Sequence, residues 1–386
     1  ITDNYIWLPY AVSQYIKITG DYSILNEKVN FLTGPKPDST QHDLYFTPNV
    51  SNEQGTVLEH CLRSLRRATG KDGTAALGPN GIPLIGTGDW NDGMNLVGEH
   101  GQGESIWLGW FIISTIKEFC AVVTDGISQD ERIYFLKFAN AVGDSIEDKG
   151  WDGNWYKRAF YDDGTPIGSS KSQECMIDNI AQSWSVISGA GKNQDIAIQS
   201  AYENLFDKKS QILKLLTPPF KNSDPNPGYI QGYPAGLREN GGQYTHGSIW
   251  LILAFALKEK GDIAHELFSA INPISHTDSP SKVAQYQTEP YVLCGDVYSE
   301  GSLAGTGGWS WYTGSSGWFY RIATEYLIGL RVNFGSEFEF KPIVPSNWNN
   351  FSVKAEIFNY KLNITYINPN GSQSGVNYIM LDGKKI

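Results

Sequence analysis

Apolar residues recur at helical spacing through most of the first 330 residues, and this periodicity constrains the fold more than any other feature. It predicts helices over residues 7–18, 56–65, 104–123, 130–147, 178–188, 194–206, 243–259, 262–270 and 317–330. Between them lie long segments rich in Gly, Asp, Asn, Tyr and Trp, at 71–103, 150–177, 219–242 and 272–316. Loops of such length are uncommon in compact domains unless they build a site. Paired helices joined by such loops fit an α/α toroid, in which the loops at one end line a pocket.

The pattern changes after Leu330, where polar and apolar residues alternate with the period of a β-strand. The alternation predicts strands over 336–342, 351–357, 361–366 and 378–381, joined by turns rich in Asn, Gly and Pro. We therefore expect a mainly α fold in two parts. A helical toroid over residues 1–333 carries the site, and a small C-terminal β-sheet domain covers residues 334–386.

Composition and charge narrow the range of partners. The chain has 12 Trp, 21 Tyr and 17 Phe, or 13% aromatic residues, together with 41 Gly. Some of these rings pack a core, but so many suit a protein that stacks rings against sugars. A net charge of −11 argues against the basic patch that a phosphate backbone requires, so we expect no nucleic-acid partner. No stretch approaches the roughly 18 apolar residues of a membrane span, so we expect no membrane contact.

The four cysteines, Cys61, Cys120, Cys175 and Cys294, are far apart and form no Cys-x-x-Cys pair. This spacing indicates neither a zinc site nor a disulfide framework, and reduced thiols are the simplest account. We expect no bound metal and a cytoplasmic location.

The most specific local motif is the run 88–97, which sets Asp89 and Asp92 three residues apart around Trp90. An indole offers an apolar face for a sugar ring, and a neighbouring carboxylic acid can protonate a glycosidic oxygen as the bond breaks. A polar loop in which Asp caps a helix is the alternative, and it would be the better interpretation of an isolated Asp-x-x-Asp. The wider sequence decides between them.

Two further clusters, at 233–246 and 307–318, are dense in groups that bind sugar hydroxyls or an oxyanion. Together with the motif at 88–97, they resemble the phosphorylases of glycoside hydrolase family 94, formerly glycosyltransferase family 36. The resemblance covers essentially the whole chain, and it implies an (α/α)6 barrel followed by a β domain. It also includes the segments 152–158, 162–164, 174–178 and 289–292, and the pattern of Pro342, Pro345 and Trp348.

The resemblance implies inverting phosphorolysis of a β-linked glucan or disaccharide, which yields a sugar 1-phosphate. One carboxylic acid protonates the leaving oxygen while inorganic phosphate attacks the anomeric carbon from the opposite face. Phosphate is already anionic, so no catalytic base is required; it is a co-substrate, and no cofactor is implied. By the family's motif the acid is Asp92, and Trp90 lies against the sugar near the scissile bond. Asp89 is interpreted as structural, accepting hydrogen bonds from loop amides.

The resemblance also implies binding roles for residues outside this motif. Phosphate is held by His246 and by the hydroxyl and backbone amides at Thr313 and Gly314, where a glycine lets the backbone approach an anion. Sugar contacts are assigned to Asp3 on the donor side and to Tyr233, Arg238 and Glu239 on the acceptor side. For Arg238 and Glu239, the alternative to sugar binding is a surface ion pair.

Within the family, residues 291–298 followed by 307–314 look more like the β-1,2-glucan enzymes than like cellobiose phosphorylase. The former are the β-1,2-oligoglucan phosphorylases and the phosphorylase-like domain of cyclic β-1,2-glucan synthases, so we expect a β-1,2-linked glucan as acceptor. The family's N-terminal β-sandwich, linker helices, first part of the barrel and upstream arginines have no counterpart here. We therefore expect a C-terminal fragment with weak or no phosphorolysis when isolated. The expected partners are an oligosaccharide, phosphate and, as in many family members, a second copy of the chain.

Two other functions stay open. An inverting hydrolase on the same barrel needs a second carboxylate roughly 6.5–9.5 Å from Asp92 to activate water. It would release free sugar without phosphate. A non-catalytic glycan-binding domain of a larger cyclic glucan synthase would keep the aromatic loops but would not need the carboxyl group of Asp92.

Overall fold

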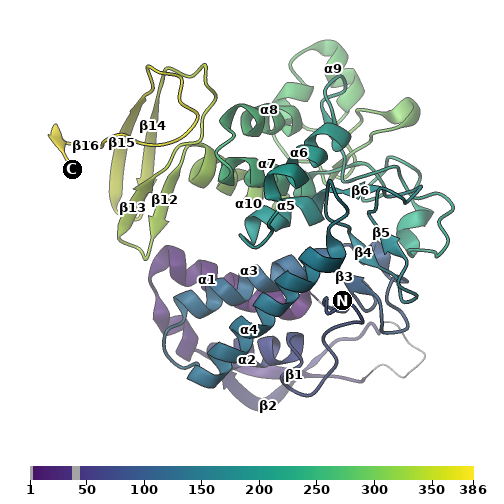
Figure 1. The fold of residues 1–386 in the computed structure, drawn as a ribbon. Coiled ribbons are helices and arrows are strands. Elements are labelled where there is room, and N and C mark those ends of the chain that lie inside the picture. The colour runs from purple at the N-terminus through teal and green to yellow at the C-terminus, as the bar shows by residue number, and fades with distance from the viewer. Residues whose placement is uncertain (1–2, 37–43) are drawn as a thin grey trace.

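Helices are the main secondary structure of the computed structural model, which describes residues 3–36 and 44–386 (Figure 1). Helices α3 and α7 are buried on almost every side because their sequences are apolar all round. A π-helical segment, Ile322–Leu327, continues the last helix. The α-helices are α1 (Asn4–Thr19), α2 (Val57–Ala68), α3 (Ile106–Val122), α4 (Gln129–Ser145), α5 (Asn179–Ile187), α6 (Gln194–Leu205), α7 (Thr245–Leu257), α8 (Gly261–Ile271), α9 (Pro280–Tyr286) and α10 (Thr313–Arg321).

Alternate helices along the chain occupy an inner and an outer layer. The inner row runs α1, α3, α5, α7 and α10, each packed against the next. Helix α10 returns to α1, because the rings of Tyr10 and Trp318 stack with centroids 6.5 Å apart. Helices α2, α4, α6 and α8 lie outside, each packed against the inner helix that precedes it. The mainly helical class predicted from the sequence is confirmed.

The predicted helix boundaries hold where capping residues mark them. Thr56 and Ser105 accept hydrogen bonds from the amides of Glu59 and Leu108 and so begin α2 and α3. Gly20 ends α1 in a left-handed conformation with φ of 71°. The prediction over 317–330 was wrong at both ends, because α10 begins four residues earlier and its π-helical extension stops before a strand.

Short strand pairs tie the long loops together between the helices. The hairpin of β1 (Lys28–Thr33) and β2 (Asn49–Thr56) was missed because most of its side chains are exposed and polar, so no alternation appears. Several of the other pairs bring distant loop segments side by side. They join β3 (Glu104–Ser105) with β4 (Ala159–Phe160) and β5 (Pro166–Ile167), β6 (Ile177–Asp178) with β9 (Leu216–Thr217), β7 (Phe206–Asp207) with β8 (Ile212–Leu213), and β10 (Gln243–Tyr244) with β11 (Asp296–Val297).

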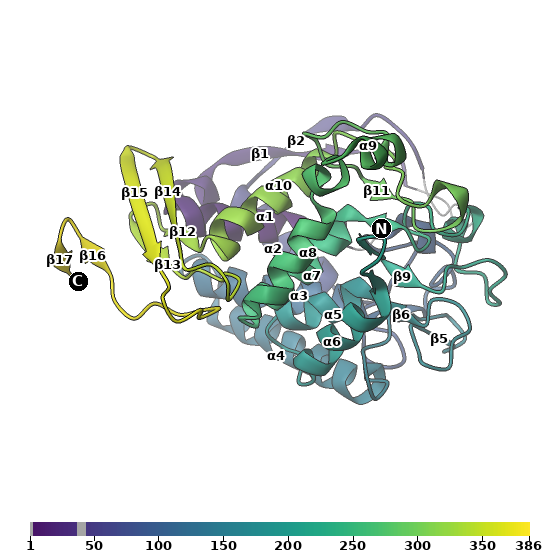
Figure 2. The same cartoon turned by 90° about the horizontal axis from the view of Figure 1, so that it is seen from above.

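The C-terminal strands form antiparallel pairs that project to one side of the helices (Figure 2). Side chains on β14 alternate between exposed and half-buried, as the sequence predicted. The predicted domain boundary at 333/334 falls in the turn between β12 and β13. The pairs are β12 (Leu330–Asn333) with β13 (Glu337–Phe340), β14 (Asn350–Ile357) with β15 (Tyr360–Ile367), and β16 (Met380–Leu381) with β17 (Lys384–Lys385).

The turn after β12 closes the C-terminal end of α1. The amides of Phe334 and Gly335 donate to the carbonyls of Lys17 and Ile18 at 2.7 and 2.8 Å. These carbonyls lie in the last turn of α1, where no intrahelical donor remains for them. At the other side of the same region, the carboxylate of Asp262 in α8 accepts from the amide of Ser346 at 2.7 Å.

Across the described residues, none of the helices combines the length and the apolar character that a membrane crossing demands. All four cysteines are buried free thiols.

Candidate active site

The N-terminal ends of the inner helices meet around the loop 88–92. The hydroxyl of Ser105, which caps α3, donates to Asp89 at 2.6 Å. Asp178, which caps α5, lies 3.4 Å from Arg158, the ion-pair partner of Asp89. His246, in the first turn of α7, has its ring 5.5 Å from that of Trp90. Because a helix carries partial positive charge at its N-terminus, this gathering favours an anion in an otherwise acidic chain.

Asp89 is a structural residue in this arrangement. Both of its oxygens accept from the guanidinium of Arg158 at 2.7 Å, and both side chains are fully buried. Asp89 also accepts from the amide of Asn91 at 3.0 Å, which bends the loop toward the next residue. These contacts agree with the interpretation of Asp89 as the residue that holds the loop.

Asp92 differs from Asp89 in almost every respect. It begins the short 3-10 helix Asp92–Met94, reaches solvent, and makes no hydrogen bond or ion pair within the described part of the chain. Burial by surrounding atoms nevertheless raises the pKa of its carboxyl group, and the nearby charge of Asp89 acts in the same direction. An unpaired carboxyl group with a raised pKa is suited to giving up a proton to a bound ligand.

Trp90 and His246 form one aromatic cluster beside Asp92. The Trp90 ring lies 5.1 Å from Trp250, and His246 lies 4.5 Å from the same ring and 6.3 Å from Trp318. The Nε2 atom of His246 is shielded from solvent and has no hydrogen-bond partner in the described residues. Burial lowers the pKa of His246 to about 4, so the ring is neutral at neutral pH. A buried ring nitrogen without a hydrogen-bond partner lowers the stability of the fold unless a ligand forms a hydrogen bond with it.

Thr313 and Gly314 open α10 and are both exposed. Tyr312 precedes them and offers no side-chain cap, so the first amides of α10 lack a partner from that residue. A side-chain atom added at Gly314 would meet nothing within 4 Å, which leaves room for a ligand against the backbone. Trp318, one turn further on, brings α10 against His246, so the predicted phosphate residues come from neighbouring helix ends.

Asp3 lies at the start of α1 and is 3% exposed. Its Oδ2 accepts from the indole of Trp7 at 2.7 Å, whereas its Oδ1 is buried with no partner in the described residues. Burial raises the pKa of Asp3 to about 6, and the hydrogen bond from Trp7 opposes that rise only in part. The free oxygen is placed to accept a hydrogen bond from a ligand hydroxyl.

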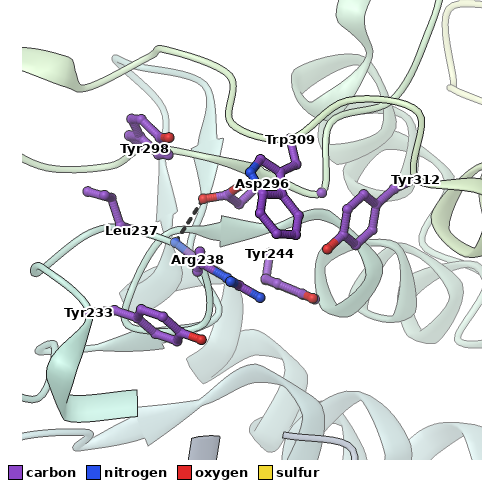
Figure 3. Close-up of a pocket in the computed structure, with 9 residues that line it drawn as sticks. Tyr233, Leu237, Arg238, Tyr244, Asp296, Tyr298, Trp309 and Tyr312 are labelled. Carbon is purple, nitrogen blue, oxygen red and sulfur yellow. Dashed lines mark hydrogen bonds between the residues drawn. The ribbon is translucent and has the colours of Figure 1, made fainter. Parts of the chain in front are cut away.

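Two of the three predicted acceptor-side residues, Tyr233 and Arg238, line a cavity of about 120 Å³ (Figure 3). The guanidinium of Arg238 lies between the rings of Tyr233 and Trp309, 4.8 and 5.1 Å from their centroids. Tyr233 lies within electrostatic reach of Asp92, so one wall of the cavity is near that carboxyl group. Tyr244 and Tyr312 complete the opposite wall.

Glu239 stands beside this cavity rather than in its lining. Its Oε2 lies 3.4 Å from Nε of Arg238 and is otherwise shielded from solvent with no hydrogen-bond partner in the described residues. Burial raises the pKa of Glu239, with the charge of Arg238 acting against that rise. The ion pair that was the alternative role is therefore present, and its Arg238 side chain lines the cavity.

Sequence reasoning missed two residues that organise the site. Arg158 joins Asp89 to Asp178 from the far side of the loop, and Asp296 accepts backbone hydrogen bonds from Arg238 and Trp309. Gly308 lies so close that a Cβ there would be 2.1 Å from Oδ1 of Asp296. The only sequence signal was the charge of Arg158 and Asp296 inside otherwise polar, aromatic loops.

The described residues contain no group of three His, Cys, Asp or Glu side chains arranged to hold a metal ion. What the site offers instead is one unpaired acid, a cluster of aromatic faces and several unsatisfied donors. This set can protonate a leaving oxygen, orient sugar rings and hold an anion.

A family model described as the catalytic domain of the glycosyl hydrolase 94 superfamily matches residues 1–329. The chain is 44% identical over 359 residues to the cyclic beta-(1,2)-glucan synthase NdvB of Rhizobium meliloti (strain 1021). That match covers 92% of this chain and 12% of the synthase. The chain is also 30% identical over 390 residues to solabiose phosphorylase of Paenibacillus borealis, which covers 100% of this chain and 47% of that enzyme. The chain thus spans less than half the length of either relative.

Among solved structures, a sialidase superposes with a TM-score of 0.55 over 85% of this chain and 30% of that one. The sequence identity is 14%, so this likeness concerns the fold alone.

Proposed function

The chain belongs to the glycosyl hydrolase 94 superfamily, and from this membership we propose that it transfers a glycosyl group from a β-linked glucan to inorganic phosphate. The reaction inverts the anomeric centre and releases a sugar 1-phosphate. The inner row of helices is, in this proposal, part of an (α/α)6 barrel whose loops surround the reacting sugar.

One observation carries the proposal: Nε2 of His246 is buried and has no hydrogen-bond partner among the described residues, while its ring contacts Trp90 of the Asp92 loop and Trp318 of α10. The His246 ring lies 5.5 Å from the ring of Trp90 and 6.3 Å from the ring of Trp318. A phosphate bound at His246 would therefore reach the open amides at Thr313 and Gly314 and approach the sugar opposite Asp92. Convergent N–H donors at helix N-termini are an established form of phosphate site.

Asp92 acts as the general acid in this reaction. Its raised pKa keeps a larger fraction protonated near neutral pH than an ordinary aspartate would have. Trp90 supports the sugar ring, and the free Oδ1 of Asp3 accepts from a donor-sugar hydroxyl. Arg238, Glu239 and Tyr233 bind the acceptor side of the scissile bond.

The glucan is proposed to be β-1,2-linked. This rests on the 44% identity with a synthase whose name specifies a cyclic β-(1,2)-glucan. The aromatic segments 291–298 and 307–314, which suggested this subgroup from the sequence, lie around the cavity on the acceptor side.

A second candidate, an inverting hydrolase, is favoured by the buried carboxyl group of Asp3. With a pKa of about 6 and an oxygen that has no partner in the described residues, Asp3 is suited to act as a base toward water.

Product analysis separates the two functions. The chain is incubated with a β-1,2-linked glucan with and without inorganic phosphate, and the sugars are resolved by ion-exchange chromatography. Sugar 1-phosphate that appears only with phosphate supports the proposal. Free sugar released equally in both mixtures supports the hydrolase and contradicts phosphorolysis.

A further inference from the structure

Three large aromatic side chains are held in solvent beside the acceptor cavity. Tyr291, Trp309 and Trp311, which we call the aromatic rim, expose 75%, 66% and 63% of their surface. They lie within a single loop of the sequence, where a gathering of exposed rings is unfavourable in water unless it meets a ligand.

The rim is ordered by contacts beneath it. Trp309 covers the guanidinium of Arg238, and its backbone amide bonds to the buried carboxylate of Asp296. The indole of Trp311 donates to Glu289 at 3.2 Å, and its ring meets that of Tyr291 with centroids 6.2 Å apart. Rings fixed in this way lose little conformational entropy when a ligand stacks on them.

The rim is continuous with the reacting centre. Tyr229 and Tyr233 pack edge to face at 6.0 Å, and both lie within electrostatic reach of Asp92. Tyr233 in turn packs on Arg238, and Arg238 packs on Trp309 (Figure 3). A ligand that leaves the cavity along this path meets the rim next.

The chemistry of the path suits a neutral polyhydroxylated chain. Aromatic faces accept the C–H faces of sugar rings, while Glu289 and the tyrosine hydroxyls can accept or donate hydrogen bonds at the edges. A chain with a net charge of −11 would repel a polyanion, and nothing in the rim offers a cationic cluster for one.

We propose that the aromatic rim binds the glucose units of a glucan that extend beyond the first acceptor sugar. The inference rests on the proposed function for the identity of the sugar, and it predicts a preference for long glucans over disaccharides. Trp309 also contacts Arg238 of the first acceptor subsite, so its substitution would affect both places. Substitution of Trp311 therefore tests the rim separately from that subsite.

Direct binding tests the rim without turnover. Isothermal titration calorimetry in phosphate-free buffer compares a β-1,2-linked disaccharide with a pentasaccharide, using the unaltered chain, Trp311→Ala and Trp311→Tyr. Tyr378→Ala is the matched control, since Tyr378 is 57% exposed but lies in the C-terminal β region. We expect Trp311→Ala to weaken the pentasaccharide roughly tenfold, the scale of one lost stacking contact. The disaccharide should be unaffected, and Trp311→Tyr should recover part of the loss.

Equal effects of Trp311→Ala on both sugars, or no gain in affinity from disaccharide to pentasaccharide in the unaltered chain, would overturn the proposal. Failure of phosphorolysis is recognised separately, because the products then lack sugar 1-phosphate while the length-dependent binding persists.

Discussion

The guanidinium of Arg158 makes two hydrogen bonds of 2.7 Å to the carboxylate of Asp89, and neither side chain reaches solvent. The pair spans 69 residues of sequence and fixes the loop that carries Trp90 and Asp92. A bidentate pair of this kind sets both distance and orientation. The position of Asp92 therefore depends on a fully buried residue from a distant segment of the sequence.

Arg158→Met should destabilise the chain by about 3–5 kcal/mol, because it leaves the charge of Asp89 buried without its partner. The matched control is Lys282→Met, which breaks the exposed pair with Asp278 and should cost less than about 1 kcal/mol. Urea unfolding followed by circular dichroism measures both. Equal costs for the two variants would show that the buried pair is not needed for stability.

Asp92→Asn should reduce phosphorolysis roughly 10²- to 10⁴-fold, the usual contribution of a general acid, with little change in glucan affinity. Asp144→Asn is the control, since the Asp144 side chain is 79% exposed on α4. The rate should fall as the pH rises through the pKa of Asp92, which burial holds above its ordinary value. Turnover by Asp92→Asn at the unaltered rate would show that Asp92 is not the general acid.

The imidazole of His246 should titrate near pH 4 in phosphate-free buffer. The unfolded chain binds the proton near pH 6.5, so His246 lowers stability as the pH falls from about 6.5 toward 4. Bound phosphate should raise the pKa of His246, because an anion favours the charged ring. Proton NMR of the histidine rings measures the shift.

His265 serves as an internal reference for that titration. Burial lowers its pKa as well, but its Nε2 already lies 3.0 Å from the carbonyl of Ile343, so phosphate should not move it. Equal phosphate effects on both histidines would argue against a phosphate contact at His246.

Gly314→Ala should raise the phosphate KM roughly tenfold without loss of stability. The new methyl group meets no protein atom, yet it occupies the space in which an anion would approach the backbone. Alanine also favours the helix by up to about 1 kcal/mol. Gly317→Ala is the matched control, because Gly317 is equally unobstructed in the same helix. Thermal melts and initial rates separate the two effects, and a KM shift shared by both variants would point to the helix rather than to the anion.

The sequence predicted those parts of the fold that are specified by neighbouring residues in the chain. Helix α2 has a capping threonine and an apolar stripe, and β14 alternates along its length. The start of α10 was missed because Thr313 to Gly317 is a run of weak helix formers. Packing of Trp318 against α7 and α1 overrides that propensity.

The site was less predictable because its supports act across long sequence separations. Asp296 lies 58 residues from Arg238, and no local pattern connects them. Family resemblance supplied the residues that would touch ligands, but not the buried ones that orient them. The ligand contacts assigned to Asp92, His246 and Gly314 stay predictions.

The hydrogen bonds from Phe334 and Gly335 to the end of α1 have a consequence for how the chain unfolds. Unfolding of the β12–β13 hairpin would leave two carbonyls of α1 without their hydrogen-bond donors, and fraying of α1 would release the turn in the same way. Asp262 and Ser346 couple α8 to the same region. Segments that share closing bonds lose them together. Heat should therefore melt the helices and the β region as one cooperative unit, visible as a single calorimetric transition.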